Sequence, residues 1–145
     1  MMKHLWLIFS LLSALTASLV PIFGKIGLQT VDANTATAVR AVIMAAFLVL
    51  LILLRGGTAG QVMPIIADYK IMLYITLSGV AGALSWLFYF LALKYGKVSQ
   101  VAPIDKLSVA LATIIAVLFF GEKLSPVSGT GIALILAGAV LVAWG

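Results

Sequence analysis

Five stretches of mainly apolar residues alternate with short polar segments along the chain. Each stretch is about 20 residues long, which is the length that an α-helix needs to cross the hydrocarbon core of a bilayer. None shows the strict alternation of apolar and polar residues that is typical of strands in a membrane barrel. The pattern therefore predicts an all-α membrane protein, folded as a single transmembrane domain over residues 1–145. The predicted spans are residues 5–26, 33–54, 71–93, 98–120 and 126–144.

The segments between the spans contain residues that commonly begin or end helices. Asp32 or Asn34 can cap the second span, because short polar side chains accept hydrogen bonds from the first free N–H groups of a helix. Ser125 is suited to cap a helix whose first residue is Pro126. Gly96 is expected to adopt the left-handed conformation that ends many helices. The longest connection, between the second and third spans, is expected to hold a short interfacial turn.

The composition supports lipid as the solvent for much of the surface. The chain of 145 residues is 64% hydrophobic and 9% charged, whereas a typical globular protein is about 25% charged. The net charge of +5 comes from nine lysines and arginines that are spaced singly along the chain. Because they form no basic cluster, the sequence gives no indication of nucleic-acid binding.

The residue types needed for catalysis are not grouped in this sequence. There is no paired set of carboxylates, no nucleophile beside a base and no glycine-rich phosphate loop. Cysteine is absent, and His4 is the sole histidine. We therefore expect no enzymatic activity, no catalytic residues, no metal site and no cofactor.

The positive charges flanking the spans do not favour one orientation in the membrane. With five spans, the two sides carry almost equal numbers of cations, so the positive-inside rule gives no decision. Two interpretations stay open: a few dominant charges fix one orientation, or the chain inserts both ways and pairs as an inverted homodimer. One side carries Lys3, Arg55, Lys70 and Lys123, and the other carries Lys25, Lys94 and Lys97, plus Arg40 if its side chain reaches that surface.

Four charged residues lie within or beside the spans, where an unpaired charge costs several kcal/mol. They are Lys25, Arg40, Asp105 and Lys106. Arg40 and Asp105 each lie seven residues after the start of a span that enters from the same side, about 10 Å deep. We therefore expect them to pair if the second and fourth helices touch. Adjacent Asp105 and Lys106 point about 100° apart and cannot share one helix face, so we expect them to face different neighbours, one of them Arg40 and the other a different element or a cavity.

Three interpretations of these charges are open. They can form an internal network that reaches the interface, or their excess positive charge can attract an anionic group into a shared cavity. Alternatively, Asp105 can carry a proton, although Arg40 beside it would lower the pKa that such a role requires to be raised.

Small and polar residues recur at spacings of three and four along the third span, from Tyr74 to Tyr89. Such a stripe normally lets helices pack closely. The alternative is a water-accessible pathway. Its lining would be Ser85, Trp86, Tyr89 and Lys106.

Several segments together resemble an EamA domain of the drug/metabolite transporter superfamily. They are Val-Pro-Ile-Phe-Gly-Lys-Ile-Gly-Leu at residues 20–28, Arg40, Gly-Lys-Val-Ser-Gln-Val-Ala-Pro at residues 96–103, and Phe-Phe-Gly-Glu-Lys-Leu-Ser-Pro at residues 119–126. The resemblance covers essentially the whole chain. It implies a multi-pass protein of the bacterial inner membrane and a five-helix unit that is half of a ten-helix inverted-repeat transporter. A lone unit can rebuild that arrangement only by pairing with an inverted copy.

These observations predict a secondary transporter that moves a small polar or anionic metabolite by alternating access, as a homodimer that can be antiparallel. Its expected partners are the small-molecule substrate, membrane lipid and a second copy of the chain. One alternative is a flippase for a lipid-linked anionic head group, and another is a membrane scaffold or accessory subunit that transports nothing. The predicted substrate-binding residues are Lys25, Arg40, Ser85, Trp86, Tyr89, Asp105 and Lys106.

Overall fold

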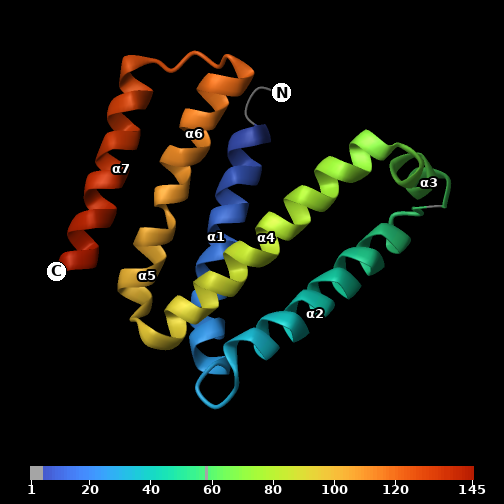
Figure 1. Cartoon of the computed structure of the whole chain (residues 1–145), viewed down its shortest axis with the longest axis horizontal. Helices are drawn as coiled ribbons and strands as arrows, with labels where there is room; N and C mark the ends of the chain where they lie inside the picture. The colour runs from blue at the N-terminus through green and yellow to red at the C-terminus, as the bar shows by residue number, and fades with distance from the viewer. Residues whose placement is uncertain (1–4, 58) are drawn as a thin grey trace. The chain divides into compact units, whose positions relative to one another are not determined.

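The computed structural model describes residues 5–57 and 59–145, so Lys3 and His4 lie outside the described residues. The structure is 87% helical, and the described residues contain no strand. Figure 1 labels the helices in chain order. They are α1 (Leu5–Gly27), α2 (Ala33–Leu54), α3 (Ala59–Ala67), α4 (Tyr69–Tyr95), α5 (Val98–Asp105), α6 (Leu107–Phe120) and α7 (Pro126–Trp144).

Five helical segments are long and apolar enough to cross a membrane. They are α1, α2, α4, the consecutive pair α5 and α6, and α7, with mean hydropathies between 1.7 and 2.6. Their bounds agree with the predicted spans to within two residues. The predicted all-α membrane fold with five transmembrane helices is therefore confirmed.

The N-terminal caps of α2 and α7 form as the sequence predicts. The Asp32 carboxylate accepts a 2.9 Å hydrogen bond from the Thr35 N–H and so caps α2. The Ser125 hydroxyl accepts a 3.1 Å hydrogen bond from the Ser128 N–H, and Pro126 opens α7. These side chains replace the intrahelical partners that the first N–H groups of a helix lack.

The expectation for Gly96 is wrong. Positive φ occurs instead at Gly56, which follows α2, and at Gly121, which ends α6 with φ 65°. Gly96 has no positive φ, and Lys97 enters α5 in an extended conformation. Gly96 and Lys97 alone separate the two helices, so α5 begins directly from the extended Lys97 without a left-handed residue before it.

The chain divides into two compact units. One consists of residues 27–94 and holds α2, α3 and α4; the other consists of residues 5–26 and 95–145 and holds α1, α5, α6 and α7. We call them the hairpin unit and the bundle unit.

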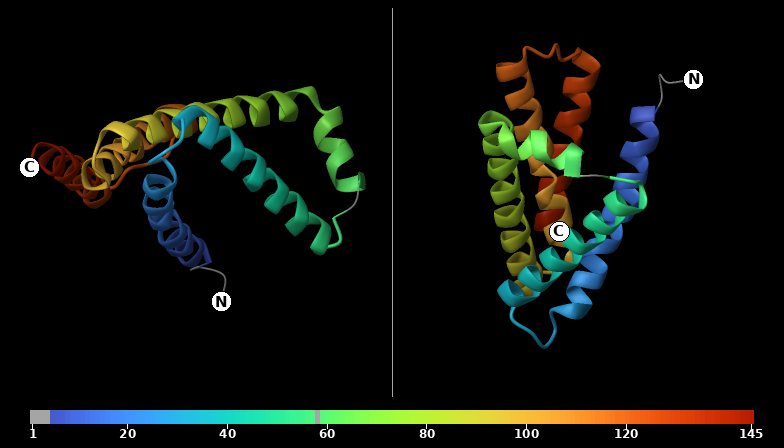
Figure 2. Two further views of the ribbon diagram at one scale, coloured as in Figure 1. Left: turned by 90° about the horizontal axis from the view of Figure 1, so that it is seen from below. Right: turned by 90° about the vertical axis from the view of Figure 1, so that its right-hand side faces the viewer.

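In the hairpin unit, α2 and α4 approach each other near the start of α2 and the end of α4 and then diverge. The left view of Figure 2 shows this divergence, with α3 in the connection at the far end. Helix α3 has nine residues, and its one polar side chain is that of Gln61. It occupies the connection in which the sequence predicts an interfacial turn.

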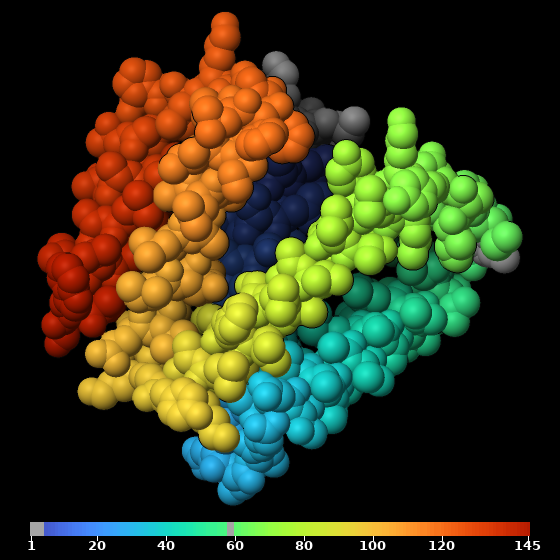
Figure 3. Space-filling view, viewed as in Figure 1, coloured from blue at the N-terminus to red at the C-terminus, as the bar shows by residue number. Residues whose placement is uncertain are grey.

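In the bundle unit, α7 packs against both α5 and α6. Figure 3 shows α7 lying along this helical pair. Ala110 of α6 and Ala139 of α7 are buried. Small side chains of this kind let helix backbones approach closely, which is how helices associate in a membrane where lipid is as apolar as leucine.

The helices leave most of their apolar side chains exposed. Two compact soluble proteins of half this mass would together expose about 8,600 Å², whereas this chain exposes 11464 Å². Large apolar residues remain uncovered on all five spans, for example Phe9, Phe47, Phe88, Phe119 and Leu134. Lipid or another membrane protein must therefore cover these surfaces.

Candidate functional site

A groove of about 660 Å³ separates α2 from α4 within the hairpin unit. Helix α2 lines it from Asn34 to Leu48 at spacings of three and four residues, so one face of the helix forms one wall. Helix α4 lines the other wall from Gly79 to Leu87. The groove lies within the size range of small-molecule binding sites, about 300–1,000 Å³.

Small side chains keep this groove open. Ala41 and Ala45 lie on the α2 wall, and Gly79, Gly82 and Ala83 lie on the α4 wall. A side chain added at Gly79 or Gly82 would meet no neighbouring atom within 4 Å. The small residues of α4 therefore leave space beside α2 here and do not pack against it.

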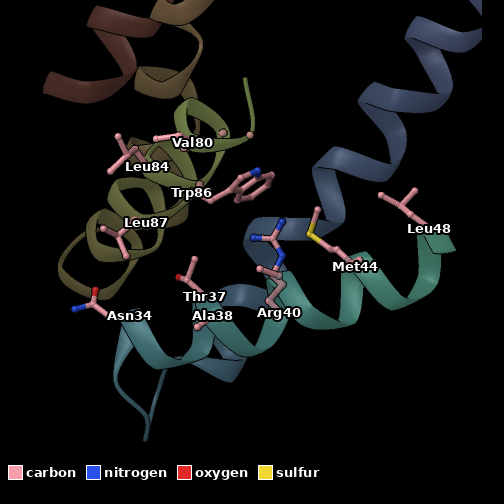
Figure 4. Close-up of a pocket in the computed structure, with 15 residues that line it drawn as sticks. Asn34, Thr37, Ala38, Arg40, Met44, Leu48, Val80, Leu84, Trp86 and Leu87 are labelled. Atoms are coloured by element: carbon pink, nitrogen blue, oxygen red, sulfur yellow. The ribbon is translucent and has the colours of Figure 1, made fainter. Parts of the chain in front are cut away.

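The Arg40 side chain extends from α2 toward Trp86 of α4, as Figure 4 shows. Its Cζ atom lies 3.6 Å from the centroid of the Trp86 ring and 4.8 Å from that of Phe90. Trp86 and Phe90 are four residues apart, so they share one face of α4, and their rings stack with centroids 5.8 Å apart. The two rings together form a surface against which the guanidinium rests.

Aromatic faces stabilise the Arg40 charge without neutralising it. A cation over an aromatic ring gains about 2 kcal/mol when it is removed from water. None of the groove-lining residues is acidic, and no carboxylate of the described residues in the hairpin unit forms an ion pair with Arg40. The guanidinium has five N–H donors in a planar fork, so it can bind an anion such as a carboxylate or a phosphate.

Two other predicted lining residues lie close to this cluster along the chain. The Tyr89 ring meets Trp86 edge to face with centroids 5.8 Å apart, and it contacts Phe90 in the same way. Tyr89 thus supports the two rings beneath Arg40, while Ser85 lies exposed on α4. Neither residue lines the described groove, and their roles in substrate binding stay predictions.

Asp105 and Lys106 belong to the bundle unit, and the expectation that they face different neighbours is wrong. The Lys106 Nζ lies 3.2 Å from the Asp105 Oδ2 and forms an ion pair with it. α5 ends at Asp105 and α6 begins at Leu107, and at this break the Lys106 N–H bonds to the Pro103 carbonyl, three residues back. The direction in which two neighbouring Cβ atoms point does not decide the contact, because the long Lys106 side chain reaches back to the adjacent carboxylate.

The predicted pair between Arg40 and Asp105 would join the two units, and it stays a prediction. Within their own units, Arg40 contacts aromatic rings and Asp105 binds Lys106.

Lys25 connects two segments of the bundle unit that are distant in sequence. Its Nζ donates a 2.8 Å hydrogen bond to the carbonyl of Gly96. This bond ties the end of α1 to the turn that precedes α5. Lys25 therefore has a structural contact, and its predicted role as a charge donor to substrate stays a prediction.

Sequence reasoning missed Phe90, which lies against Arg40, and Asn34 and Met44, which line the groove. Phe90 resembles any other apolar residue of a membrane span until its contact with Arg40 is known. Its spacing of four residues from Trp86 is the signal that could have identified it, because a cation in a membrane helix often lies against aromatic faces. Asn34 and Met44 line the same α2 face as Arg40.

Comparison with known proteins agrees with this architecture. The model of the EamA-like transporter family matches residues 4–144. A protein of Sinorhizobium, named as an uncharacterized transporter in the region 3′ of cobO, is 38% identical over 142 residues, which is 98% of this chain and 99% of that protein. An uncharacterized protein of Methanocaldococcus jannaschii is 35% identical over 78 residues, covering 54% of this chain and 57% of its own length. No solved structure gives a significant match.

Proposed function

Because this chain belongs to the EamA-like transporter family, we propose that it is a secondary transporter that moves a small polar or anionic metabolite across the bacterial inner membrane. Membership makes it a multi-pass membrane transporter, and this role is not an enzymatic one. We further propose that transport proceeds by alternating access and that the protein acts as a homodimer.

The observation that carries the proposal is the Arg40 side chain in the groove between α2 and α4. It is a permanent cation within a membrane-spanning helix, held by the faces of Trp86 and Phe90 and with no acidic residue in the groove. Ionisable residues at membrane depth are rare, costly and usually functional. An anionic group of the substrate supplies the counter-charge that the groove lacks.

The working form is a homodimer of two oppositely oriented copies. The EamA unit is a half-size unit of the transporter. Because the number of spans is odd, a second copy fused to the first would be inverted automatically, whereas a lone unit obtains an inverted partner only if the chain inserts in both orientations. The nearly equal cations on the two sides of the membrane support insertion both ways. The uncovered apolar faces of the spans are available for contact with the second copy.

Alternating access follows from two inverted units around a shared site near the middle of the membrane. Rocking of one copy against the other would open the groove first to one side and then to the other. Arg40 holds the anionic group while the neighbouring helices move.

The function is tested by reconstituting the purified protein in proteoliposomes and measuring uptake of a panel of labelled amino acids, organic acids and phosphate esters. We expect saturable uptake of at least one anionic compound, reduced about tenfold to a hundredfold by Arg40→Ala, because a hydrogen bond to a charged group contributes about 1.5–3 kcal/mol. Lys106→Ala tests the second predicted cation, and Lys70→Ala is the matched control, since Lys70 lies outside the groove. Unchanged uptake in both Arg40→Ala and Lys106→Ala would contradict the site assignment.

The assembly has a separate test. Reporter proteins active on only one side of the membrane are fused after Gly145, one for each side. Both fusions are expected to be active if the chain inserts in both orientations. Activity on one side alone would remove the inverted homodimer from the proposal and leave the groove untouched.

A further inference from the structure

Polar side chains are confined to one end of the groove between α2 and α4. Asn34, Thr37 and Arg40 supply them from the first turns of α2, while the α2 wall from Ala41 to Leu48 is apolar. On the α4 wall, the indole N–H of Trp86 is the polar side-chain group among the lining residues. Figure 4 shows Arg40 at the polar end and Met44 and Leu48 following it along α2.

This distribution disfavours several classes of small metabolite. The ammonium group of an amino acid would find no carboxylate among the lining residues. A sugar would bury hydroxyl groups along the apolar wall, where they have no partners, and an unpaired buried polar group costs free energy. The Thr37 hydroxyl already donates to the Ala33 carbonyl at 2.7 Å, which leaves it only as an acceptor.

The dimensions of the groove suit a small molecule. From Arg40 to Leu48 the α2 wall rises about 12 Å, and the volume of about 660 Å³ is in the middle of the range for small-molecule sites. A ligand that matches the charge of the groove carries a single anionic group, because Arg40 is the one charged residue among those that line the groove.

We infer that the groove binds an amphiphilic organic acid, whose single anionic group lies at Arg40 and whose apolar body lies along Ala41, Met44 and Ala45. This inference rests on the proposed transport function and narrows its substrate class. The free acid, not the head group of a membrane lipid, is the ligand to which the size of the groove points.

Binding to the purified, detergent-solubilised protein is measured by titration calorimetry with four related probes. 3-Phenylpropionate has both the anionic group and the apolar body, and 3-phenylpropionamide lacks the charge. Phenylalanine adds an ammonium group to the same body, and lactate has a carboxylate without the apolar body. We expect 3-phenylpropionate to bind at least tenfold more tightly than each of the other three.

Two substitutions assign this preference to the groove. Arg40→Gln is expected to remove the preference for 3-phenylpropionate over its amide, with the helical content and melting temperature checked by circular dichroism. Ala45→Leu fills the apolar part of the groove. We expect it to weaken the binding of 3-phenylpropionate at least fivefold and to leave the binding of lactate unchanged. Ala46→Leu is the matched control, because Ala46 neighbours Ala45 on α2 but does not line the groove.

The remaining outcomes overturn the inference. Binding of the amide, phenylalanine or lactate as tight as that of 3-phenylpropionate would show that charge and apolar body are not jointly recognised. Displacement of 3-phenylpropionate by phosphatidylglycerol, but not by phosphatidylcholine, in mixed micelles would identify a lipid head group as the ligand. Uptake of a wholly polar anion in the proteoliposome assay would also overturn it while leaving the proposed transport function intact, whereas absence of any uptake would contradict that function itself.

Discussion

The bundle unit and the hairpin unit differ in how closely their small residues are packed. In the bundle unit, α7 packs on α5 and α6 with Ala110 and Ala139 buried. In the hairpin unit, α2 and α4 diverge, and their alanines and glycines line open space. Ala139 of the bundle unit is thus buried, and the groove left between α6 and α7 is about 290 Å³, less than half the volume of about 660 Å³ that the small residues of the hairpin unit line.

The treatment of charge differs in the same way. In the bundle unit, Lys106 pairs with Asp105 and Lys25 bonds to the Gly96 carbonyl. In the hairpin unit, Arg40 lies over aromatic rings and forms no ion pair with a described carboxylate of that unit. Charges that are paired within their own unit are typical of a scaffold, whereas a cation that meets only aromatic rings in its unit can receive an anion.

The largest expected difference concerns the free energy of unfolding. Ala139→Leu inserts extra carbon atoms into the contact made by α7 and is expected to destabilise the protein by about 1–3 kcal/mol. Ala45→Leu makes the same chemical change on the open wall of the groove and is expected to shift stability by less than about 0.5 kcal/mol. Thermal unfolding in detergent compares the two, and equal losses would erase the distinction between packed and open units.

Removing the aromatic ring beside Arg40 is expected to have the next largest effect, in this case on the rate of uptake. Trp86→Ala removes the ring 3.6 Å from the Arg40 Cζ, and we expect uptake to fall about tenfold, which corresponds to about 1.4 kcal/mol. Trp86→Phe keeps an aromatic face and should restore most of the activity. Tyr74→Ala, which removes an exposed ring of α4 outside the groove, is the control. A loss as large in Tyr74→Ala would mean that α4 tolerates no aromatic truncation, whatever its relation to Arg40.

The sequence predicts the five spans well because membrane crossing depends on length and composition. The caps at Asp32 and Ser125 are likewise local, since each side chain bonds to an N–H three residues ahead. Gly96 shows the limit of this reasoning. A glycine between two helices permits a left-handed turn but does not require one.

The candidate site is only partly readable from the sequence. Arg40 is conspicuous as a cation in an apolar helix, and Trp86 is recognisable as a lining residue. Their contact depends on the path of the connection between α2 and α4, which no local pattern specifies. Asp105 and Lys106 pair although adjacent residues point in different directions on a helix, because the length of the lysine side chain, and not the helix angle alone, decides which groups it reaches.

A smaller effect is expected at the ion pair of the bundle unit. The Lys106 and Asp105 side chains are 57% and 35% exposed, and partly exposed ion pairs typically contribute about 0.2–1 kcal/mol. A double-mutant cycle with Asp105→Asn and Lys106→Gln, measured by thermal unfolding, should give a coupling energy within that range. A coupling energy of several kcal/mol would mean that the ion pair is shielded from water. The bundle unit would then also contain a buried charge that is a candidate for a functional role.

The smallest expected effect is the response to acid of the two helix caps, Asp32 in the hairpin unit and Ser125 in the bundle unit. Hydrogen bonds from the Thr35 N–H and hydroxyl lower the pKa of Asp32 below its ordinary value of about 3.9. A carboxylate with a lowered pKa in the folded state stabilises the fold above its unfolded pKa and loses that contribution as the pH falls through the folded pKa. The protection of the Thr35 amide against hydrogen exchange, measured relative to its intrinsic exchange rate at each pH, should therefore fall below about pH 4 in the wild type and not in Asp32→Asn, because asparagine caps without titrating. The Ser125 cap of α7 has no titrating group, so the Ser128 amide should show no such step; a matching step at Ser128 would mean that acid loosens the helices through groups other than their caps.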